Sequence, residues 1–167
     1  MRTAICSGSF DPITLGHLDI IGRAAGCFDE IWVCVSPNAE KTSPMFLPDQ
    51  KLEMVRAAVA HLPNVYAELW PGLLAEFAAA HQASVIVRGV RCVSDFDNEY
   101  QMALINRGLR PGLETMLLPA SGEFQHFSSS MAREMIRYRQ PLEKYLPAPI
   151  IPLVEKLREE GGTKHGQ

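Results

Sequence analysis

Short apolar runs alternate with segments of helical periodicity along most of the chain. The apolar runs, which are rich in β-branched residues, predict buried strands over 3–6, 31–35, 65–70, 84–87 and 115–118. Apolar residues at helical spacing predict helices over 15–25, 49–61, 73–81, 94–107, 129–138 and 150–160. Thr14 is placed to cap the first helix, and Gly26 follows near its end.

Strands that alternate with helices predict a mainly parallel sheet, because parallel strands need long crossover connections. We therefore expect an α/β fold: a single Rossmann-like domain over residues 1–160, with a parallel five-stranded sheet covered by helices on both faces, and a flexible tail over 161–167. The apolar segment 100–109 is expected to serve as core and as a substrate wall, and Leu73 and Leu74 as helix core. Ligands of such sheets bind beyond the carboxyl ends of the strands.

Composition narrows the class of protein. The chain has 167 residues, which suits one domain, and a net charge of −3, which disfavours a nucleic-acid binder. No apolar run approaches the roughly 18 residues that span a bilayer, so no membrane association is expected. The N-terminus lacks the pattern of a signal peptide, and the four cysteines lack C-x-x-C spacing. We expect a cytoplasmic protein with free thiols and no protein-held metal.

The segment 8–17 follows the first strand and reads Gly-Ser-Phe-Asp-Pro-Ile-Thr-Leu-Gly-His. Small residues let backbone amides approach a ligand, and the positive end of the helix that starts here favours phosphate. His17 lies in the first helical turn, where its imidazole can face the same ligand. The alternative is a tight turn shaped by Gly8 and Pro12 with His17 at the surface, and spacing alone leaves both interpretations open.

Charged side chains follow the fourth strand. Arg88 and Arg91 flank a glycine, and guanidinium groups there can bind phosphate oxygens. Arg91, Asp95 and Glu99 are spaced by four, so a helix that begins early enough would stack them on one face. An exposed helical ion ladder is the alternative, and the position at a strand end favours a ligand site.

Three serines over 128–130 open the helix that follows the fifth strand, and they offer hydroxyls and free amides to an anion. An ordinary N-cap is the alternative for this feature taken alone. Lys41, Arg88, Arg91 and Arg133 all fall at the predicted ligand-binding edge of an acidic chain. Their convergence predicts a local basic cleft for a small polyphosphate ligand.

These motifs together resemble those of a known family. The segment 8–17 resembles the nucleotidyltransferase signature, and the segments at Lys41, 88–99 and 128–130 extend the resemblance to bacterial phosphopantetheine adenylyltransferases, over residues 2–158. The resemblance implies a nucleotidyltransferase-type fold and a homohexamer of coenzyme A biosynthesis. It implies transfer of AMP from ATP, with Mg²⁺, to 4′-phosphopantetheine. Ser7 departs from the family, which commonly has proline there, and we expect this departure to loosen the first turn.

The resemblance also implies the site residues. The catalytic residues would be Ser9, His17, Lys41 and Arg88. ATP would contact Ser9, Phe10, His17, Gly89, Arg91, Glu99, Phe124, Phe127, Ser128, Ser129 and Ser130. Phosphopantetheine would contact Ser9, Lys41, Leu73, Leu74, Arg88, Met102, Asn106 and Glu134.

The chemistry implied by this family needs little from the protein beyond positioning. A phosphate monoester with a second pKa near 6 is mostly dianionic at pH 7 and is already a nucleophile. We therefore expect direct in-line displacement, with Mg²⁺ held mainly by ATP oxygens and water. Two rivals remain: a related transferase acting on nicotinamide mononucleotide or on a sugar or polyol phosphate, and a non-catalytic flavodoxin-like module, which predicts no role for His17.

Overall fold

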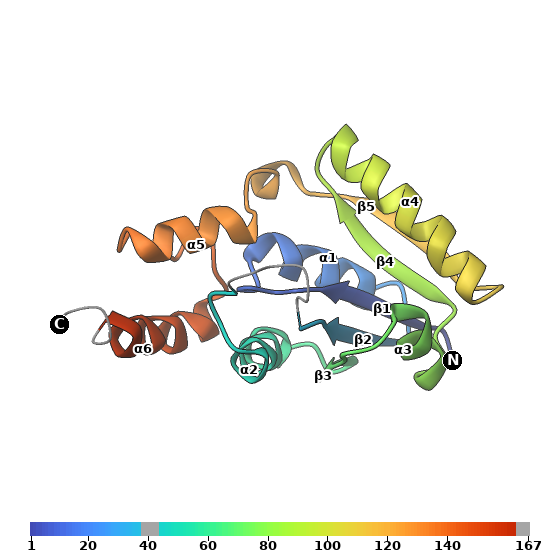
Figure 1. Cartoon of the computed structure of the whole chain (residues 1–167), viewed down its shortest axis with the longest axis horizontal. Helices are drawn as coiled ribbons and strands as arrows, with labels where there is room; N and C mark the ends of the chain where they lie inside the picture. The colour runs from blue at the N-terminus through green and yellow to red at the C-terminus, as the bar shows by residue number, and fades with distance from the viewer. Residues whose placement is uncertain (38–43, 163–167) are drawn as a thin grey trace.

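The computed structural model describes residues 1–37 and 44–162. Its five strands form one parallel sheet in the order β3-β2-β1-β4-β5, as the sequence predicted (Figure 1). The strands are β1 (Thr3–Gly8), β2 (Glu30–Val35), β3 (Val65–Leu69), β4 (Val85–Val90) and β5 (Glu114–Pro119). The α-helices are α1 (Leu15–Ala25), α2 (Pro48–Val59), α3 (Leu74–Ala80), α4 (Val93–Leu109), α5 (Ser129–Arg137) and α6 (Ile151–Gly162). Two 3₁₀ turns, η1 (Gly122–Phe124) and η2 (Ala148–Ile150), complete them.

Helices cover both faces of the sheet, because side chains alternate along each strand. On one face, Ala4 and Cys6 pack in a core with residues of α1, α2, α5 and α6. On the other face, Ile5 packs with Phe77 of α3, and α4 lies against β4 and β5. The predicted two-sided α/β fold is confirmed.

The sheet splits at its centre, between β1 and β4. These two strands pair only as far as Cys6 and Val87, although β1 continues beside β2 to Gly8 and β4 continues beside β5 to Val90. The chain also reverses direction here, since it runs from β1 outward to β3 and then crosses back to β4. Such a switch point leaves a crevice at the carboxyl ends of the strands.

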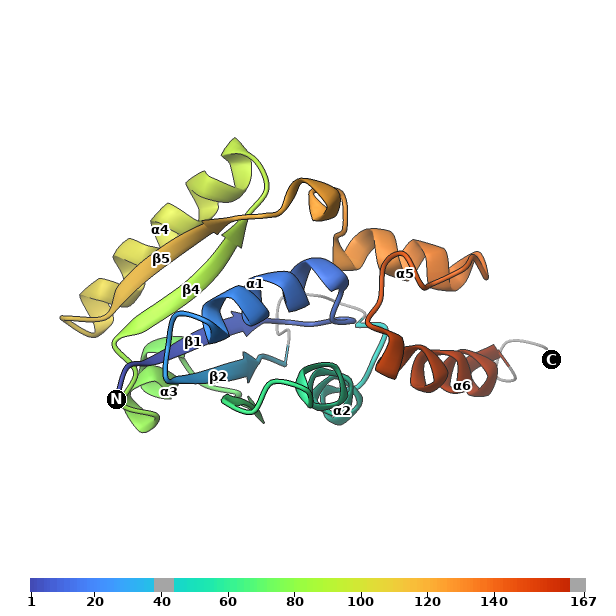
Figure 2. The ribbon, with the colours of Figure 1, turned by 180° about the vertical axis from the view of Figure 1, so that it is seen from behind.

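Helices α5 and α6 lie together beyond these carboxyl ends, as both views of the ribbon show (Figures 1 and 2). Ile136 of α5 and Val154 of α6 belong to the main core. Helix α6 ends at Gly162, and 163–167 lie outside the described residues, so the flexible tail stays a prediction. No helix within the described ranges is both long and apolar enough to cross a bilayer.

The expectation that 100–109 forms core is wrong. Tyr100, Leu104 and Leu109 are each more than half exposed, and Asn106 is the buried residue of α4. Apolar residues occur all round this helix rather than in one stripe, so packing on β4 and β5 at the sheet edge covers few of them. Leu73, expected in a helix core, precedes α3 and is 53% exposed.

Candidate active site

A cavity of about 340 Å³ opens at the carboxyl ends of β1 and β4, beside the N-terminus of α1. It occupies the split in the sheet, where a ligand site was predicted. The predicted ATP-binding residues all line it: Ser9, Phe10, His17, Gly89, Arg91, Glu99, Phe124, Phe127, Ser128, Ser129 and Ser130. The fold therefore gathers three segments that are far apart in the sequence.

A buried carboxylate holds the turn after β1. Asp11 is 1% exposed and accepts hydrogen bonds from the backbone N–H groups of Met45 and Phe46, each at 3.0 Å. Phe10 adopts a φ of 44°, in the left-handed region that non-glycine residues rarely visit, and its ring packs edge-on against the ring of His17. The sequence did not reveal the role of Asp11, because its partners lie 34 and 35 residues away.

His17 is oriented by the cap of its own helix. The Thr14 hydroxyl accepts from the backbone N–H of His17 at 3.3 Å, and the Thr14 backbone N–H donates to His17 Nδ1 at 3.1 Å. Because Nδ1 accepts, a neutral ring carries its proton on Nε2. Burial lowers the pKa of His17 from 6.5 to about 4, with help from the charges of Arg88 and Arg91. At pH 7 His17 is therefore a neutral Nε2–H donor.

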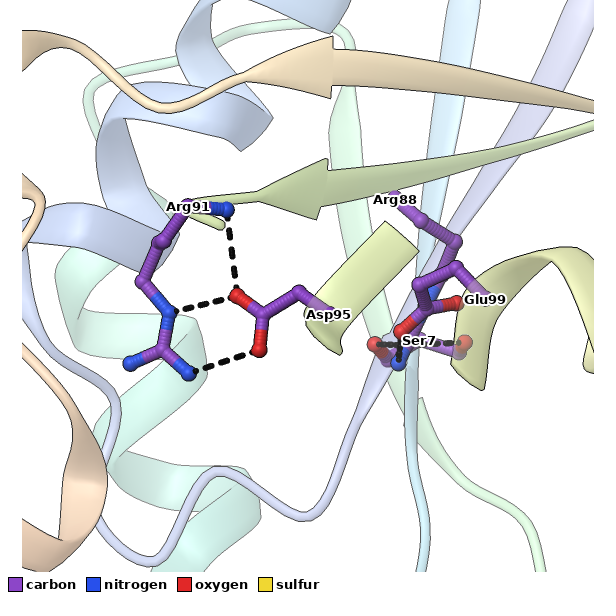
Figure 3. Close-up of polar contacts among 5 residues, drawn as sticks. All are labelled: Ser7, Arg88, Arg91, Asp95 and Glu99. Carbon is purple, nitrogen blue, oxygen red and sulfur yellow. Dashed lines mark hydrogen bonds and ion pairs between the residues drawn. The ribbon is translucent and has the colours of Figure 1, made fainter. Parts of the chain in front are cut away.

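Arg88 crosses the split in the sheet. It lies within β4, paired with Leu117, and not after the strand as the sequence suggested. Its Nε and Nη2 donate to the two carboxylate oxygens of Glu99 at 2.7 and 2.6 Å. Its Nη1 donates to the Ser7 backbone oxygen and, at 2.9 Å, to Ser7 Oγ (Figure 3). Arg88 therefore ties β4 to both β1 and α4.

Arg91 forms a separate ion pair with Asp95 (Figure 3). Asp95 Oδ2 accepts from the Arg91 backbone N–H and Nε at 3.0 and 2.9 Å, and Oδ1 accepts from Nη2 at 3.2 Å. The guanidinium holds the pKa of Asp95 below its usual value. The condition for stacking Arg91, Asp95 and Glu99 on one helical face is not met, because α4 begins only at Val93. Glu99 pairs with Arg88 instead, so the alternative of an exposed ion ladder is not found either.

The hydroxyls of Ser128, Ser129 and Ser130 form hydrogen bonds with other residues of the protein. Ser128 Oγ accepts from the backbone N–H of Met131 at 3.1 Å and so caps α5. Ser129 Oγ donates to the Pro12 backbone oxygen at 2.9 Å, and Ser130 Oγ accepts from Arg133 Nη2 at 3.0 Å. The backbone amides at the start of α5 are thus what this segment offers an anion.

Arg133 was predicted at the ligand-binding edge, and the structure places it elsewhere. Its Nη1 donates to the Asp11 backbone oxygen at 2.8 Å and lies 3.7 Å from the Asp11 carboxylate. A buried carboxylate is costly without a counter-charge, and Arg133 supplies one. The predicted basic cleft is correspondingly weaker, since Arg88 and Arg91 are each paired with a carboxylate as well.

A second cavity, of about 450 Å³, adjoins the first. The two share a wall made of Ser7, Gly8, Ser9, Arg88 and Glu99. Each cavity can therefore present a ligand to the other across residues that both touch.

The second cavity collects part of the predicted phosphopantetheine set. Leu74, Met102 and Asn106 line it, whereas Leu73 and Glu134 are exposed and lie outside both walls. Lys41 lies outside the described residues. The assignment of these residues to substrate contacts stays a prediction.

The arrangement suits two anions side by side. It combines the N-termini of α1 and α5, a neutral imidazole donor and two guanidinium groups. Cys6 also lines the first cavity, but burial raises the pKa of its thiol to about 12, so it is no nucleophile at neutral pH. Across the described part of the chain, no group of three His, Cys, Asp or Glu side chains is placed to hold a metal ion.

Comparison with known proteins agrees with this geometry. Residues 5–135 match the family described as cytidylyltransferase-like. A Symbiobacterium thermophilum protein named phosphopantetheine adenylyltransferase is 46% identical over 147 residues, which cover 88% of this chain and 90% of that protein. A Heliobacterium modesticaldum protein of the same name is 42% identical over 167 residues, covering 100% of this chain and 98% of that protein.

A solved structure shares the fold at low sequence identity. A Vibrio parahaemolyticus protein, provisionally assigned as a nicotinate-nucleotide adenylyltransferase, superposes with a TM-score of 0.67 at 19% identity. The match covers 100% of this chain and 98% of that protein. At this identity the likeness supports the nucleotidyltransferase-type fold and nothing about the acceptor.

Proposed function

The chain belongs to the phosphopantetheine adenylyltransferase family, and from this membership we propose how its two cavities carry out the reaction. The enzyme transfers the adenylyl group of ATP to 4′-phosphopantetheine, giving dephospho-coenzyme A and pyrophosphate, in coenzyme A biosynthesis. The free state of all four cysteines fits our further proposal that it acts in the cytoplasm.

The main support for the mechanism is the wall that the two cavities share. We place ATP in the first cavity and phosphopantetheine in the second, so that the phosphate of one meets the α-phosphorus of the other at Ser9 and Arg88. Two ligands held in this way react as if within one molecule, which accounts for much of the rate enhancement in such transfers.

The transfer itself is a direct in-line displacement. An oxygen of the phosphopantetheine phosphate forms a bond to the α-phosphorus, while the bond from that phosphorus to the bridging oxygen breaks and pyrophosphate leaves. A dianionic phosphate needs no general base. The Nε2–H of His17 donates to the α-phosphate oxygens as negative charge grows there, a role for which a preorganised neutral donor is well suited.

The other residues of the first cavity contact the phosphates and the nucleoside of ATP in this proposal. Arg91 and the backbone amides of 128–130 take the β- and γ-phosphates and stabilise the departing pyrophosphate. Phe124 and Phe127 belong to the wall of the same cavity. Glu99 carries a negative charge and is better suited to the ribose hydroxyls than to a phosphate, and it must leave Arg88 at least in part to reach them.

Mg²⁺ enters as MgATP in this proposal. Asp95 and Glu99, the carboxylates of the first cavity, are both engaged by arginines, so the described residues offer no ready ligand set of their own. ATP oxygens and water can complete the octahedral coordination that Mg²⁺ prefers. Mg²⁺ supplies charge neutralisation on the phosphates when it is bound.

We also propose that the enzyme is a homohexamer, as its resemblance implies. Apolar side chains exposed on α4, among them Val93, Tyr100 and Leu104, support burial of this helix against another copy. Analytical ultracentrifugation that gives the mass of a monomer at micromolar concentration would contradict the proposal.

Mass spectrometry of the product tests the function. The protein is mixed with MgATP and, in parallel, with 4′-phosphopantetheine, nicotinamide mononucleotide and a sugar phosphate. Dephospho-coenzyme A in the first mixture and no adenylylated product in the others is the expected result. Titration calorimetry should show phosphopantetheine binding weakened by Lys41→Ala and by Arg88→Ala, and unchanged affinity would contradict those two assignments.

A further inference from the structure

Ser7 lies at the point where β1 and β4 separate, and no role for it followed from the sequence. It still pairs with Cys34 of β2, so the expected loosening does not interrupt the strand. On its other side the pairing with β4 has already ended, at Cys6 and Val87. The guanidinium of Arg88 fills the gap and bonds to both oxygens of Ser7 (Figure 3).

The four hydrogen bonds of the Arg88 guanidinium divide between two partners. Nη1 donates to the backbone oxygen and to Oγ of Ser7. The opposite edge, formed by Nε and Nη2, is taken by the Glu99 carboxylate in a bidentate pair. This is the edge geometry with which arginine binds phosphate. A phosphate that binds this edge of Arg88 bidentately must therefore replace Glu99, whereas Ser7 can remain.

We infer that Ser7 is a positioning residue for the acceptor phosphate, which it serves by holding Arg88 while Glu99 gives way. The inference rests on the proposed function. Ser7 fixes the guanidinium at the wall that both cavities share, and Ser7 itself lines both of them. Without the hydroxyl, Arg88 keeps one bond to the Ser7 backbone and is free to swing with Glu99.

The proton of the Ser7 hydroxyl supports the same role. Arginine has no acceptor, so a serine oxygen that accepts from Arg88 still has its own O–H to donate. In the shared wall, the acceptor phosphate would offer oxygens to that O–H once it is bound. The Ser7 hydroxyl would thus accept from the Arg88 guanidinium and donate to the acceptor phosphate.

Steady-state kinetics with both substrates varied tests this role. Ser7→Ala should raise the KM for 4′-phosphopantetheine on the order of tenfold, the scale of a lost hydrogen bond to a charged group, and leave the KM for ATP within about twofold. Ser7→Thr, which restores the hydroxyl, should return the KM close to that of the wild type. Ser84→Ala is the matched control, because Ser84 is exposed, precedes β4 and lines neither cavity.

A double mutant separates positioning from general packing. In an Arg88→Ala background, Ser7→Ala should weaken calorimetric binding of phosphopantetheine by less than it does in the wild type, because the part of the effect that acts through Arg88 is already lost. If Ser7→Ala fails to fold by circular dichroism, Ser7→Cys replaces it with the same expectation, because sulfur is a weak acceptor.

Three results would overturn the inference while the wild type still makes dephospho-coenzyme A. They are an unchanged KM for phosphopantetheine in Ser7→Ala, an equal rise for both substrates, and a Ser7→Thr variant no better than Ser7→Ala. A wild-type protein that forms no dephospho-coenzyme A refutes the proposed function instead.

Discussion

Replacing His17 tests the assignment of a neutral hydrogen-bond donor at the α-phosphate. Ala removes both functions of the ring: the Nδ1 acceptor that caps Thr14 and the Nε2–H donor. Gln at the same helix position can keep the cap, since a glutamine oxygen there also accepts from the N-cap backbone N–H. It also carries an amide N–H that can donate in place of Nε2. The pair of variants therefore separates loss of the donor from loss of the cap.

The expected loss follows from the geometry. One preorganised donor removed from a developing oxyanion costs about 10²–10³ in kcat, so His17→Ala should fall by at least about 10². His17→Gln should recover part of that loss. His17→Ala also leaves the backbone N–H of Thr14, a fully buried residue, without its acceptor, which costs about 1–3 kcal/mol of folding stability. His17→Gln should avoid most of that cost.

The pH dependence gives a second result from the same variants. With its pKa at about 4, His17 stays neutral from pH 5.5 upward and contributes no ionisation to the rate there. An acid limb near pH 6 is still expected, because the substrate phosphate loses its second negative charge. The limb therefore belongs to the substrate and should persist unchanged in His17→Gln.

The lowered pKa of His17 also makes the folding stability depend on pH. Unfolding restores the pKa of His17 from about 4 to 6.5, so below pH 6.5 the unfolded chain binds the extra proton and folding stability falls. At 1.36 kcal/mol per unit, the wild type should lose about 2 kcal/mol between pH 7 and pH 5 that His17→Gln does not lose.

Pyrophosphate release measured from pH 5.5 to 8 and urea unfolding at pH 5 and 7 supply both tests. Two results would refute the reasoning: near wild-type turnover in His17→Ala, or an acid limb that disappears in His17→Gln. The first would remove the donor role, and the second would make His17 the titrating group.

Two further predictions concern single side chains. Gly89→Ala places a Cβ 2.8 Å from Ile20 Cγ1 and should lower the folding stability by roughly 1–3 kcal/mol in thermal unfolding. Gly22→Ala, which has open space at its Cβ, should be neutral or stabilising. Equal melting temperatures of the two variants would contradict the close packing at Gly89. Arg91→Ala should raise the KM for ATP severalfold and leave that for phosphopantetheine unchanged; an ATP KM equal to that of the wild type would remove Arg91 from the phosphate site.

The sequence predicted the elements well because strong local signals mark them. Thr14 is a good N-cap followed by a periodic helix, and the structure begins α1 at the residue expected. The predicted burial of α4 is wrong for a physical reason. Hydrophobicity shows that a residue prefers burial but not which surface covers it, and α4 leaves Tyr100 and Leu104 exposed.

The sequence predicted which residues line the first cavity but not how their side chains pair. The prediction that ligand-binding residues gather at the strand ends is confirmed for His17 and Arg88, which line one cavity. The partner of Arg88 could not be inferred from spacing, because Glu99 is 11 residues away and Ser7 is 81 residues away. The spacing of four is matched by the ion pair of Arg91 with Asp95, but α4 begins only at Val93, and Glu99 pairs with Arg88 instead.

The central claim is that two anions held on either side of one wall react directly, without a covalent intermediate on the enzyme. The stereochemical course at the α-phosphorus tests this claim most directly. ATP with sulfur in place of one α-phosphate oxygen, as a single diastereomer, is converted in the presence of 4′-phosphopantetheine, and the configuration of the thio-product is determined by ³¹P NMR. A single displacement predicts inversion. Retention would require two successive displacements and would contradict the account.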